Sequence, residues 1–333
     1  MPAVDSRPLL LAPDSFKGTF RASEIAAAMA RGLEAGGILA IDRCPVADGG
    51  EGTTEVLLTA LGGETAGAEV SDPLGRPVRA GFALLDDGAT AIVEVAQASG
   101  LGLVEPAERD AEAASSAGTG ELILAAVEAG AELVLVAAGG SASTDGGAGA
   151  TERIETDGGL RGARLVVLCD VRTPFERAAS VFAPQKGADA RAVTRLERRL
   201  ERLASELPRD PRGVPMSGAA GGLAGGLWAR FGARLEPGAA FVLGALDFDR
   251  RMRAARAVIG GEGRLDSQTL AGKALGEIGT RCRQGGVPLY AIVGQNALDA
   301  FGARRIDLQV VLEAGTLAEV EAAAAALAED ERL

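Results

Sequence analysis

Glycine-rich loops that directly follow apolar segments are the feature that most constrains the fold of this chain. Glycine accounts for 47 of the 333 residues, about twice the usual ~7%. The apolar run at 9–11 leads into the turn "APDSFKG", and the apolar segment at 38–46 leads into "ADGGEGT". In both cases a segment with helical character follows, at 23–37 and 54–63. This alternation of strand, loop and helix is typical of a parallel α/β sheet.

A change in this rhythm near residue 68 indicates a second domain. The segments 76–85 and 90–96 flank Asp86-Asp87-Gly88, which is a hairpin signal and predicts an antiparallel element. The strand-loop-helix rhythm returns in the carboxyl-terminal third of the chain, so we expect both ends of the chain to pair in one sheet. We therefore predict two α/β domains: a discontinuous parallel-sheet domain at 1–67 plus 255–333, and an inserted mixed α/β domain at 68–254.

Composition excludes several classes of function. The net charge of -12 and the 3% of aromatic residues argue against binding to nucleic acid, which requires a basic surface. The chain contains no histidine, so Ser-His-Asp triads and histidine general bases are excluded. Cys44, Cys169 and Cys282 follow no paired spacing, which supports neither disulfides nor a zinc site and is consistent with a reducing cytoplasm.

The chain shows no sign of a membrane segment. The apolar part of the first fifteen residues is too short for a signal peptide, and no run approaches the roughly 18 apolar residues of a membrane span. We expect a cytoplasmic protein without a membrane partner. The alanine-rich segment at 317–330 would suit either a homo-oligomer interface or the cover of a sheet.

Lysine is rare and occurs only in glycine-bearing polar motifs. Of the 34 basic residues only three are lysines, Lys17 in "DSFKG", Lys186 in "PQKGA" and Lys273 in "LAGKALG". A compact ammonium group on a flexible stem differs chemically from a planar guanidinium group. In a chain that otherwise uses arginine, these three lysines are candidates for specific anion contacts.

Four glycine loops combine small residues with hydroxyls and carboxylates. They are "ADGGEGT" at 47–53, "GGSASTDGGAG" at 139–149, "GAAGGLAGG" at 218–226 and "GGEGRLDSQT" at 260–269. Glycine lets backbone N–H groups approach a polyphosphate, and Asp or Glu can hold a hard metal ion. The literal Walker and dinucleotide motifs are not matched, but the set of loops favours phosphoryl transfer.

Motifs along nearly the whole chain resemble those of the glycerate kinase type-1 family. They are, in order, "LAPDSFKGTFRASEIAAAMARGL", "VADGGEGT", "SSAGTGELI", "GGSASTDGGAG", "CDVRTPF", "APQKGA", "GAAGGLAGGL", "PGAAFVL" and "GEGRLDSQTLAGKA". The resemblance implies that ATP and Mg²⁺ are used to phosphorylate D-glycerate to 2-phosphoglycerate or 3-phosphoglycerate. It also implies that the discontinuous domain is flavodoxin-like (Rossmann-like).

The chain departs from this family pattern in two places that bear on function. It is shorter than the relatives just before Leu165, and it has Arg172 and Thr173 where an acidic or amide pair is usual. The hydroxyl that is phosphorylated stays open. A sensor that binds ATP or a hydroxy acid, a kinase of a different small hydroxy acid, and a dinucleotide oxidoreductase are the alternatives.

The expected catalytic residues are Lys17, Asp48, Asp170 and Lys186. The two lysines would bind the substrate carboxylate or the γ-phosphate, and either aspartate would serve as general base in a chain without histidine. The expected substrate- and nucleotide-binding residues are Asp14, Ser15, Gly49, Gly50, Gly139, Gly140, Ser141, Asp145, Arg264 and Lys273. Glu262 and Asp266 are the expected Mg²⁺ ligands.

Overall fold

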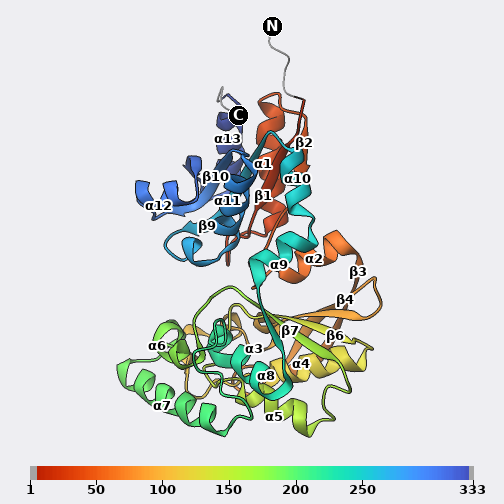
Figure 1. Cartoon of the computed structure of the whole chain (residues 1–333), viewed down its shortest axis with the longest axis vertical. Coiled ribbons are helices and arrows are strands. Elements are labelled where there is room, and N and C mark those ends of the chain that lie inside the picture. Colours follow the sequence, from red (N-terminus) through yellow and green to blue (C-terminus); the bar gives the residue numbers. More distant parts are fainter. Residues whose placement is uncertain (1–5, 330–333) are drawn as a thin grey trace. The chain divides into compact units, whose positions relative to one another are not determined.

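The computed structural model describes residues 6–329, which fold into two compact units (Figure 1). Unit 1 is formed by Met1–Asp48 and Ala239–Leu333, and unit 2 by Gly49–Gly238. The start of the amino-terminal stretch considered above, residues 1–5, and the last residue of the expected carboxyl-terminal helix lie outside the described residues.

Unit 1 contains a five-stranded parallel sheet in the order β11-β10-β9-β1-β2. Its strands are β1 (Leu9–Pro13), β2 (Ile41–Arg43), β9 (Ala257–Leu265), β10 (Leu289–Asn296) and β11 (Leu308–Glu313). Numbered within the unit, this is the order 2-1-3-4-5 of flavodoxin-like sheets. Leu11 pairs with Ile259, so the two ends of the chain share one sheet as predicted.

Helices cover both faces of this sheet. Gly261 of β9 faces Met29 of α1 (Ala22–Ala35), whereas its neighbour Gly260 faces Leu275 of α11 (Ala274–Gly285) on the opposite side. Helices α1 and α13 (Leu317–Ala328) pack closely, because a methyl group on Gly32 would lie 2.1 Å from a carbonyl oxygen of α13. The remaining helices of the unit are α9 (Gly238–Ala245), α10 (Phe248–Ala254) and α12 (Ala300–Arg305).

Unit 2 contains a six-stranded mixed sheet in the order β3-β4-β5-β6-β7-β8. Its strands are β3 (Gly63–Ser71), β4 (Pro77–Leu85), β5 (Thr90–Glu94), β6 (Leu133–Ala137), β7 (Arg164–Cys169) and β8 (Arg234–Pro237). The first three strands pair antiparallel and the last four pair parallel, so the predicted mixed α/β class is confirmed.

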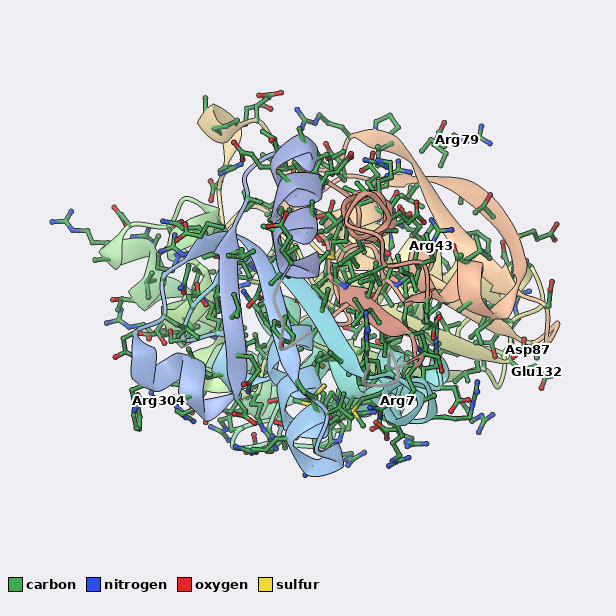
Figure 2. All side chains as sticks on the ribbon, turned by 90° about the horizontal axis from the view of Figure 1, so that it is seen from above. Arg7, Arg43, Arg79, Asp87, Glu132 and Arg304 are labelled. Atoms are coloured by element: carbon green, nitrogen blue, oxygen red, sulfur yellow. The ribbon has the colours of Figure 1, made fainter. Side chains whose placement is uncertain are left out.

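The predicted hairpin joins β4 to β5 at Asp86–Gly88. Asp87 accepts hydrogen bonds from the backbone N–H groups of Ala89 and Thr90, at 2.9 and 2.8 Å, which fixes the turn. Figure 2 shows Asp87 beside Glu132, and the N–H of Glu132 donates to the carbonyl of Ala89. The hairpin thus leads directly into the pairing of β5 with β6.

Apolar side chains from the sheet of unit 2 form one core with helices α3 (Val95–Ser99), α4 (Ala117–Glu128), α5 (Ala148–Thr156) and α8 (Leu223–Phe231). Helix α7 (Ala190–Glu206) buries Leu196 and Leu200 in a separate small core with α6 (Ala178–Phe182). Helix α2 (Thr53–Leu61) also belongs to this unit.

The compact units divide the chain at other positions than 67/68 and 254/255. Their limits lie between Asp48 and Gly49 and between Gly238 and Ala239. Helix α2 contacts β4 and β5, which places it with unit 2, whereas α10 contacts α11, which places it with unit 1. The packing of each connecting helix therefore shows which sheet it belongs to. The strand-loop-helix rhythm of the sequence alone does not show this.

Within residues 6–329, no helix has the length and apolar character needed to cross a membrane.

Candidate functional site

A polar cavity of about 390 Å³ lies in unit 1. Three neighbouring parallel strands supply it, because Asp14 follows β1, Glu262 lies in β9 and Gln295 lies in β10. Ligands of open α/β sheets bind at this carboxyl edge. The cavity brings together seven of the expected site residues: Asp14, Ser15, Lys17, Asp48, Glu262, Arg264 and Lys273.

Three carboxylates of this cavity are almost inaccessible to solvent. Asp14 is 4% exposed, Asp48 0% and Glu262 5%. Burial raises the pKa of Asp14 well above its ordinary value, the negative charge of Asp48 raises it further, and Lys17 opposes the shift. Burial also raises the pKa of Glu262 to about 7, against the opposing effects of Thr269 and Lys273. The cavity therefore concentrates negative charge that a cation would stabilise.

Two lysines reach this group of carboxylates. The ammonium group of Lys17 lies 2.8 Å from Asp48 Oδ2 and its side chain is 45% exposed. The ammonium group of Lys273 lies 3.9 Å from Glu262 Oε2. Both positive groups line the cavity, where they could also bind anionic oxygens of a ligand.

The two expected metal ligands occupy different positions. Glu262 lines the cavity, whereas Asp266 is absent from its walls. The Asp266 carboxylate accepts the backbone N–H of Gln268 at 2.9 Å and lies 3.5 Å from the Arg264 guanidinium. Among the residues that the structure describes, no three His, Cys, Asp or Glu side chains form a group that could hold a metal ion. Mg²⁺ commonly takes only one or two protein carboxylates together with substrate phosphates, so one or two of the Asp14, Asp48 and Glu262 carboxylates would suffice as its protein ligands.

A second group of expected site residues lies in unit 2, around the buried side chain of Lys186. Lys186 ends a short 3-10 helix, Pro184–Lys186, and is only 2% exposed. Its ammonium group donates to Ser141 Oγ at 2.9 Å and to the carbonyl oxygen of Ser143. Burial lowers the pKa of Lys186 to about 7, although the carboxylates of Asp145 and Asp170 favour the charged form.

The two expected glycine pairs of unit 2 lie together. A methyl group added to Gly139 would lie 2.6 Å from Cα of Gly50, a distance that only glycine allows. Gly49 has φ +91°, and a methyl group there would lie 2.6 Å from Cα of Gly238. Gly50 therefore packs directly against the start of the loop that carries Ser141.

Asp145 is buried at 1% exposure and holds this second loop in place. Its carboxylate accepts hydrogen bonds from the N–H groups of Ser116, Gly147 and Gly149, at 2.9, 3.0 and 3.2 Å, and from Ser116 Oγ at 2.8 Å. Oδ2 accepts three of these hydrogen bonds and Oδ1 accepts one, so most of the acceptor capacity of this carboxylate is used within unit 2. We infer a structural role for Asp145 rather than the ligand contact expected from sequence.

Asp170 is half-buried and directly follows β7. It is close enough to Lys186 to favour the charged form of the ammonium group. Asp170, Ser141 and Lys186 therefore belong to one polar cluster at the carboxyl edge of the parallel strands of unit 2.

Two polar residues near these groups were not expected from sequence. Glu94 ends β5, is 4% exposed and accepts the N–H of Thr54 at 2.7 Å, which fixes the loop that begins α2. Thr269 is completely buried and hydrogen-bonds Glu262. Glu94 could have been found from sequence, because it is the single acidic residue in the apolar segment "TAIVEVA". No such signal marks Thr269, whose role depends on the fold of the loop 265–273.

The chain is similar to proteins of one family along its length. Residues 9–156 and 153–332 match the model of the "Glycerate kinase family". The match is divided at the carboxyl end of α5, shortly before the point at which we expect from sequence that the chain is shorter than its relatives.

Named relatives and a solved structure agree with this match. "Glycerate kinase" of Bacillus subtilis (strain 168) is 38% identical over 88% of this chain and 86% of that protein. "Glycerate 2-kinase" of Escherichia coli (strain K12) is 35% identical over 80% of this chain and 79% of that protein. A crystal structure assigned as glycerate kinase 2 from Salmonella typhimurium LT2 aligns with a TM-score of 0.79 and 34% identity, covering 97% of each chain.

Proposed function

The chain belongs to the glycerate kinase family, and we propose that it phosphorylates D-glycerate with ATP and Mg²⁺. The observation that carries this proposal is the cavity of unit 1, in which three buried carboxylates and two lysines meet at the carboxyl edge of a parallel sheet. Phosphoryl transfer depends mainly on positioning and on neutralising charge, and this set of side chains supplies both signs of charge.

We assign the nucleotide phosphates to this cavity. Lys17 and Lys273 would contact phosphate oxygens, and carboxylates among Asp14, Asp48 and Glu262 would hold Mg²⁺. The bound metal ion would neutralise charge on the phosphate groups. The ion pair with Asp48 orients the Lys17 side chain toward the same cavity.

We assign glycerate recognition to the polar cluster of unit 2. The Ser141 hydroxyl accepts a hydrogen bond from Lys186, so its own proton can be donated to a carboxylate or hydroxyl oxygen of the substrate. Lys186 is too deeply buried for broad contact with a ligand and acts through Ser141. The charge of Lys186 makes this loop favourable for an anion such as glycerate.

Asp170 is the general base in this proposal. It is half-buried at a strand end and belongs to the cluster assigned to glycerate, whereas Asp48 is completely buried and paired with Lys17. A carboxylate within hydrogen-bond reach of the acceptor hydroxyl can take its proton as the phosphorus–oxygen bond forms. We expect Asp170→Asn to lower kcat at least 100-fold without loss of the fold.

Phosphorus NMR tests the proposed reaction directly. The purified protein is incubated with ATP, Mg²⁺ and D-glycerate, with matched samples that lack Mg²⁺ or contain L-glycerate. We expect ATP to be converted to ADP and a new phosphoester signal to form. Its coupling identifies the product, because the phosphorus of 2-phosphoglycerate couples to one proton and that of 3-phosphoglycerate to two. ATP that binds but stays intact beside glycerate and other small hydroxy acids would contradict the kinase proposal and favour a sensor.

A further inference from the structure

Thr269 is a buried polar residue between β9 and α11 that has no place in the reaction proposed above. It begins the short 3-10 helix Thr269–Ala271 and is 0% exposed. A buried hydroxyl group is costly unless its hydrogen bonds are made. The partners of this hydroxyl therefore indicate what the residue does.

The hydroxyl group of Thr269 has a defined direction. The backbone N–H of Asp266 donates to Thr269 Oγ1 at 3.2 Å, so the hydroxyl accepts that hydrogen bond. A hydroxyl has a single proton to donate. In Thr269 this proton goes to Glu262 Oε1, which lies in short hydrogen-bond contact.

Packing against α11 keeps Thr269 in this position. A methyl group added to Gly276, in the first turn of α11, would lie 2.0 Å from the carbonyl oxygen of Thr269. The N–H of Thr269 also donates to the carbonyl of Asp266 at 3.1 Å. The backbone of Thr269 is therefore held on two sides, and its hydroxyl has little freedom to leave Glu262.

The Glu262 carboxylate is consequently held from both ends. Thr269 donates to Oε1, while the ammonium group of Lys273 lies 3.9 Å from Oε2. Glu262 also lines the cavity of unit 1. These two contacts restrict the flexible Glu262 side chain, and they therefore set the direction of the remaining lone pairs of its carboxylate.

We propose that Thr269 is a positioning residue for phosphoryl transfer, whose hydroxyl group fixes the Glu262 carboxylate in the orientation that binds the Mg²⁺–ATP complex. The inference rests on the proposed function, because it requires the nucleotide to occupy the cavity of unit 1. A hydrogen bond to a charged group contributes more than a neutral one, so loss of this hydroxyl should be measurable.

Two substitutions at one position separate the hydroxyl group from its packing. Thr269→Val keeps the shape and removes the hydrogen bond, whereas Thr269→Ser keeps the hydrogen bond and removes a methyl group. Thr280→Val is a matched control, since Thr280 is half-buried in α11 and its hydroxyl donates to the helix carbonyl of Gly276. Thr269→Cys, with a weaker donor, replaces Thr269→Val if the valine variant does not fold.

Calorimetric binding of a non-hydrolysable ATP analogue with Mg²⁺ is the first readout, and kcat and KM for ATP and D-glycerate are the second. We expect Thr269→Val to weaken binding of the Mg²⁺-loaded analogue at least tenfold and to raise the KM for ATP, with the KM for glycerate within twofold of wild type. Thr269→Ser and Thr280→Val should stay within threefold of wild type in both readouts.

The outcomes distinguish this inference from the proposed function. Normal binding by Thr269→Val, or equal impairment of the serine and valine variants, would overturn the positioning role and leave the kinase proposal intact. If the wild type binds the nucleotide but does not phosphorylate glycerate, the proposed reaction fails and the binding series still decides the role of Thr269. A wild type that binds no Mg²⁺-loaded nucleotide would overturn both.

Discussion

The two units carry polar groups at equivalent places, the carboxyl edges of parallel strands, but they differ in how deeply they bury a lysine. In unit 1 the carboxylates of Asp14, Asp48 and Glu262 are buried, while the Lys17 side chain stays 45% exposed. In unit 2 it is Lys186 that is buried, at 2% exposure, together with the carboxylates of Asp145 and Glu94, while Asp170 is half-buried. We propose that the edge of unit 1 attracts a cation together with its bound anion, and that the edge of unit 2 attracts an anion.

This difference gives a chain without histidine side chains of both charges for the phosphoryl transfer that we propose. Buried charges are costly unless they are paired, as Asp48 is with Lys17. Burial raises the pKa of Glu262 to about 7 and lowers that of Lys186 to about 7, so the two clusters respond to pH in opposite directions. Substitutions that remove one charge at a time test whether the two edges are as different as we infer.

Removal of the Asp48 charge should have the largest effect. We expect Asp48→Asn to lower kcat/KM at least 1000-fold, or about 4 kcal/mol of transition-state stabilisation. The reason is that Lys17 loses the negative charge that lies 2.8 Å away and the cavity loses a buried carboxylate. Steady-state kinetics at saturating Mg²⁺ measure the change.

Asp266→Asn is the matched control for this substitution. Asp266 does not line the cavity, and an asparagine can still accept the N–H of Gln268. We expect its activity to stay within about fivefold of wild type. Similar losses in both variants would show that the cavity walls do not define the functional carboxylates.

Lys186→Met should change how stability depends on pH. The pKa of Lys186 is about 7 in the folded chain, below its ordinary value of 10.5, so folding releases a proton between these two values. Wild-type stability should therefore rise with pH over this window relative to Lys186→Met. One pKa unit corresponds to ~1.4 kcal/mol, which gives a difference of up to about 4 kcal/mol between pH 7 and 10.

Urea unfolding of both proteins across this pH range provides the measurement. The free energies of unfolding should diverge steadily as the pH rises, with the wild type gaining. Parallel pH dependences would mean that the Lys186 ammonium is solvated, which would contradict a buried charge in unit 2.

Sequence reasoning located the strands and their loops better than it located the roles of side chains. The apolar segments around Leu11 and Ile259 predicted a sheet shared by both chain ends, because apolar runs bounded by glycine loops are a local signal. Seven expected residues line one cavity for the same reason: strand ends of a parallel sheet meet at one edge. The family motifs added the order of these loops along the chain.

The roles of individual acidic residues could not be predicted in the same way. Asp145 and Asp266 stand in the same kind of glycine loop as Asp48, yet the structure turns both toward backbone N–H groups. Strand β3 was also missed, since its exposed residues lack an apolar pattern. Such outcomes depend on hydrogen bonds between distant segments, as with Ser116 and Asp145, which no local pattern encodes.

Asp145→Ala should destabilise unit 2 by about 3 kcal/mol, because several buried donors lose their acceptor. The free energy of unfolding at pH 7 measures this loss. Asp157→Ala is the control, since Asp157 is exposed at the end of α5 and its contact with Arg153 is 3.5 Å long. We expect at most about 0.5 kcal/mol there. An Asp145→Ala variant that is as stable as the wild type but inactive would instead support the ligand contact that was expected from sequence.

Glu262→Gln should produce the opposite sign of pH dependence. The pKa of Glu262 is about 7 in the folded chain, above its ordinary value of 4.5, so the wild type binds a proton on folding between these values and loses stability as the pH rises. Glutamine resembles the protonated carboxyl group and can still accept the hydrogen bond from Thr269. At ~1.4 kcal/mol per pKa unit, and without Mg²⁺, the variant should match the wild type near pH 4 and exceed its free energy of unfolding by about 3 kcal/mol at pH 8.

Chemical denaturation in the presence of a chelator measures this difference in the free energy of unfolding. Steady-state kinetics with Mg²⁺ measure the accompanying change in activity. A variant that is more stable but less active would show that the buried charge is retained for function at a cost in stability. As the pH rises, the wild type should lose stability relative to Glu262→Gln and gain stability relative to Lys186→Met. The two comparisons therefore assign each pH dependence of folding to its own unit. Equal pH dependence of wild type and Glu262→Gln would instead place the Glu262 carboxylate in contact with solvent, and unit 1 would lose its distinction from unit 2.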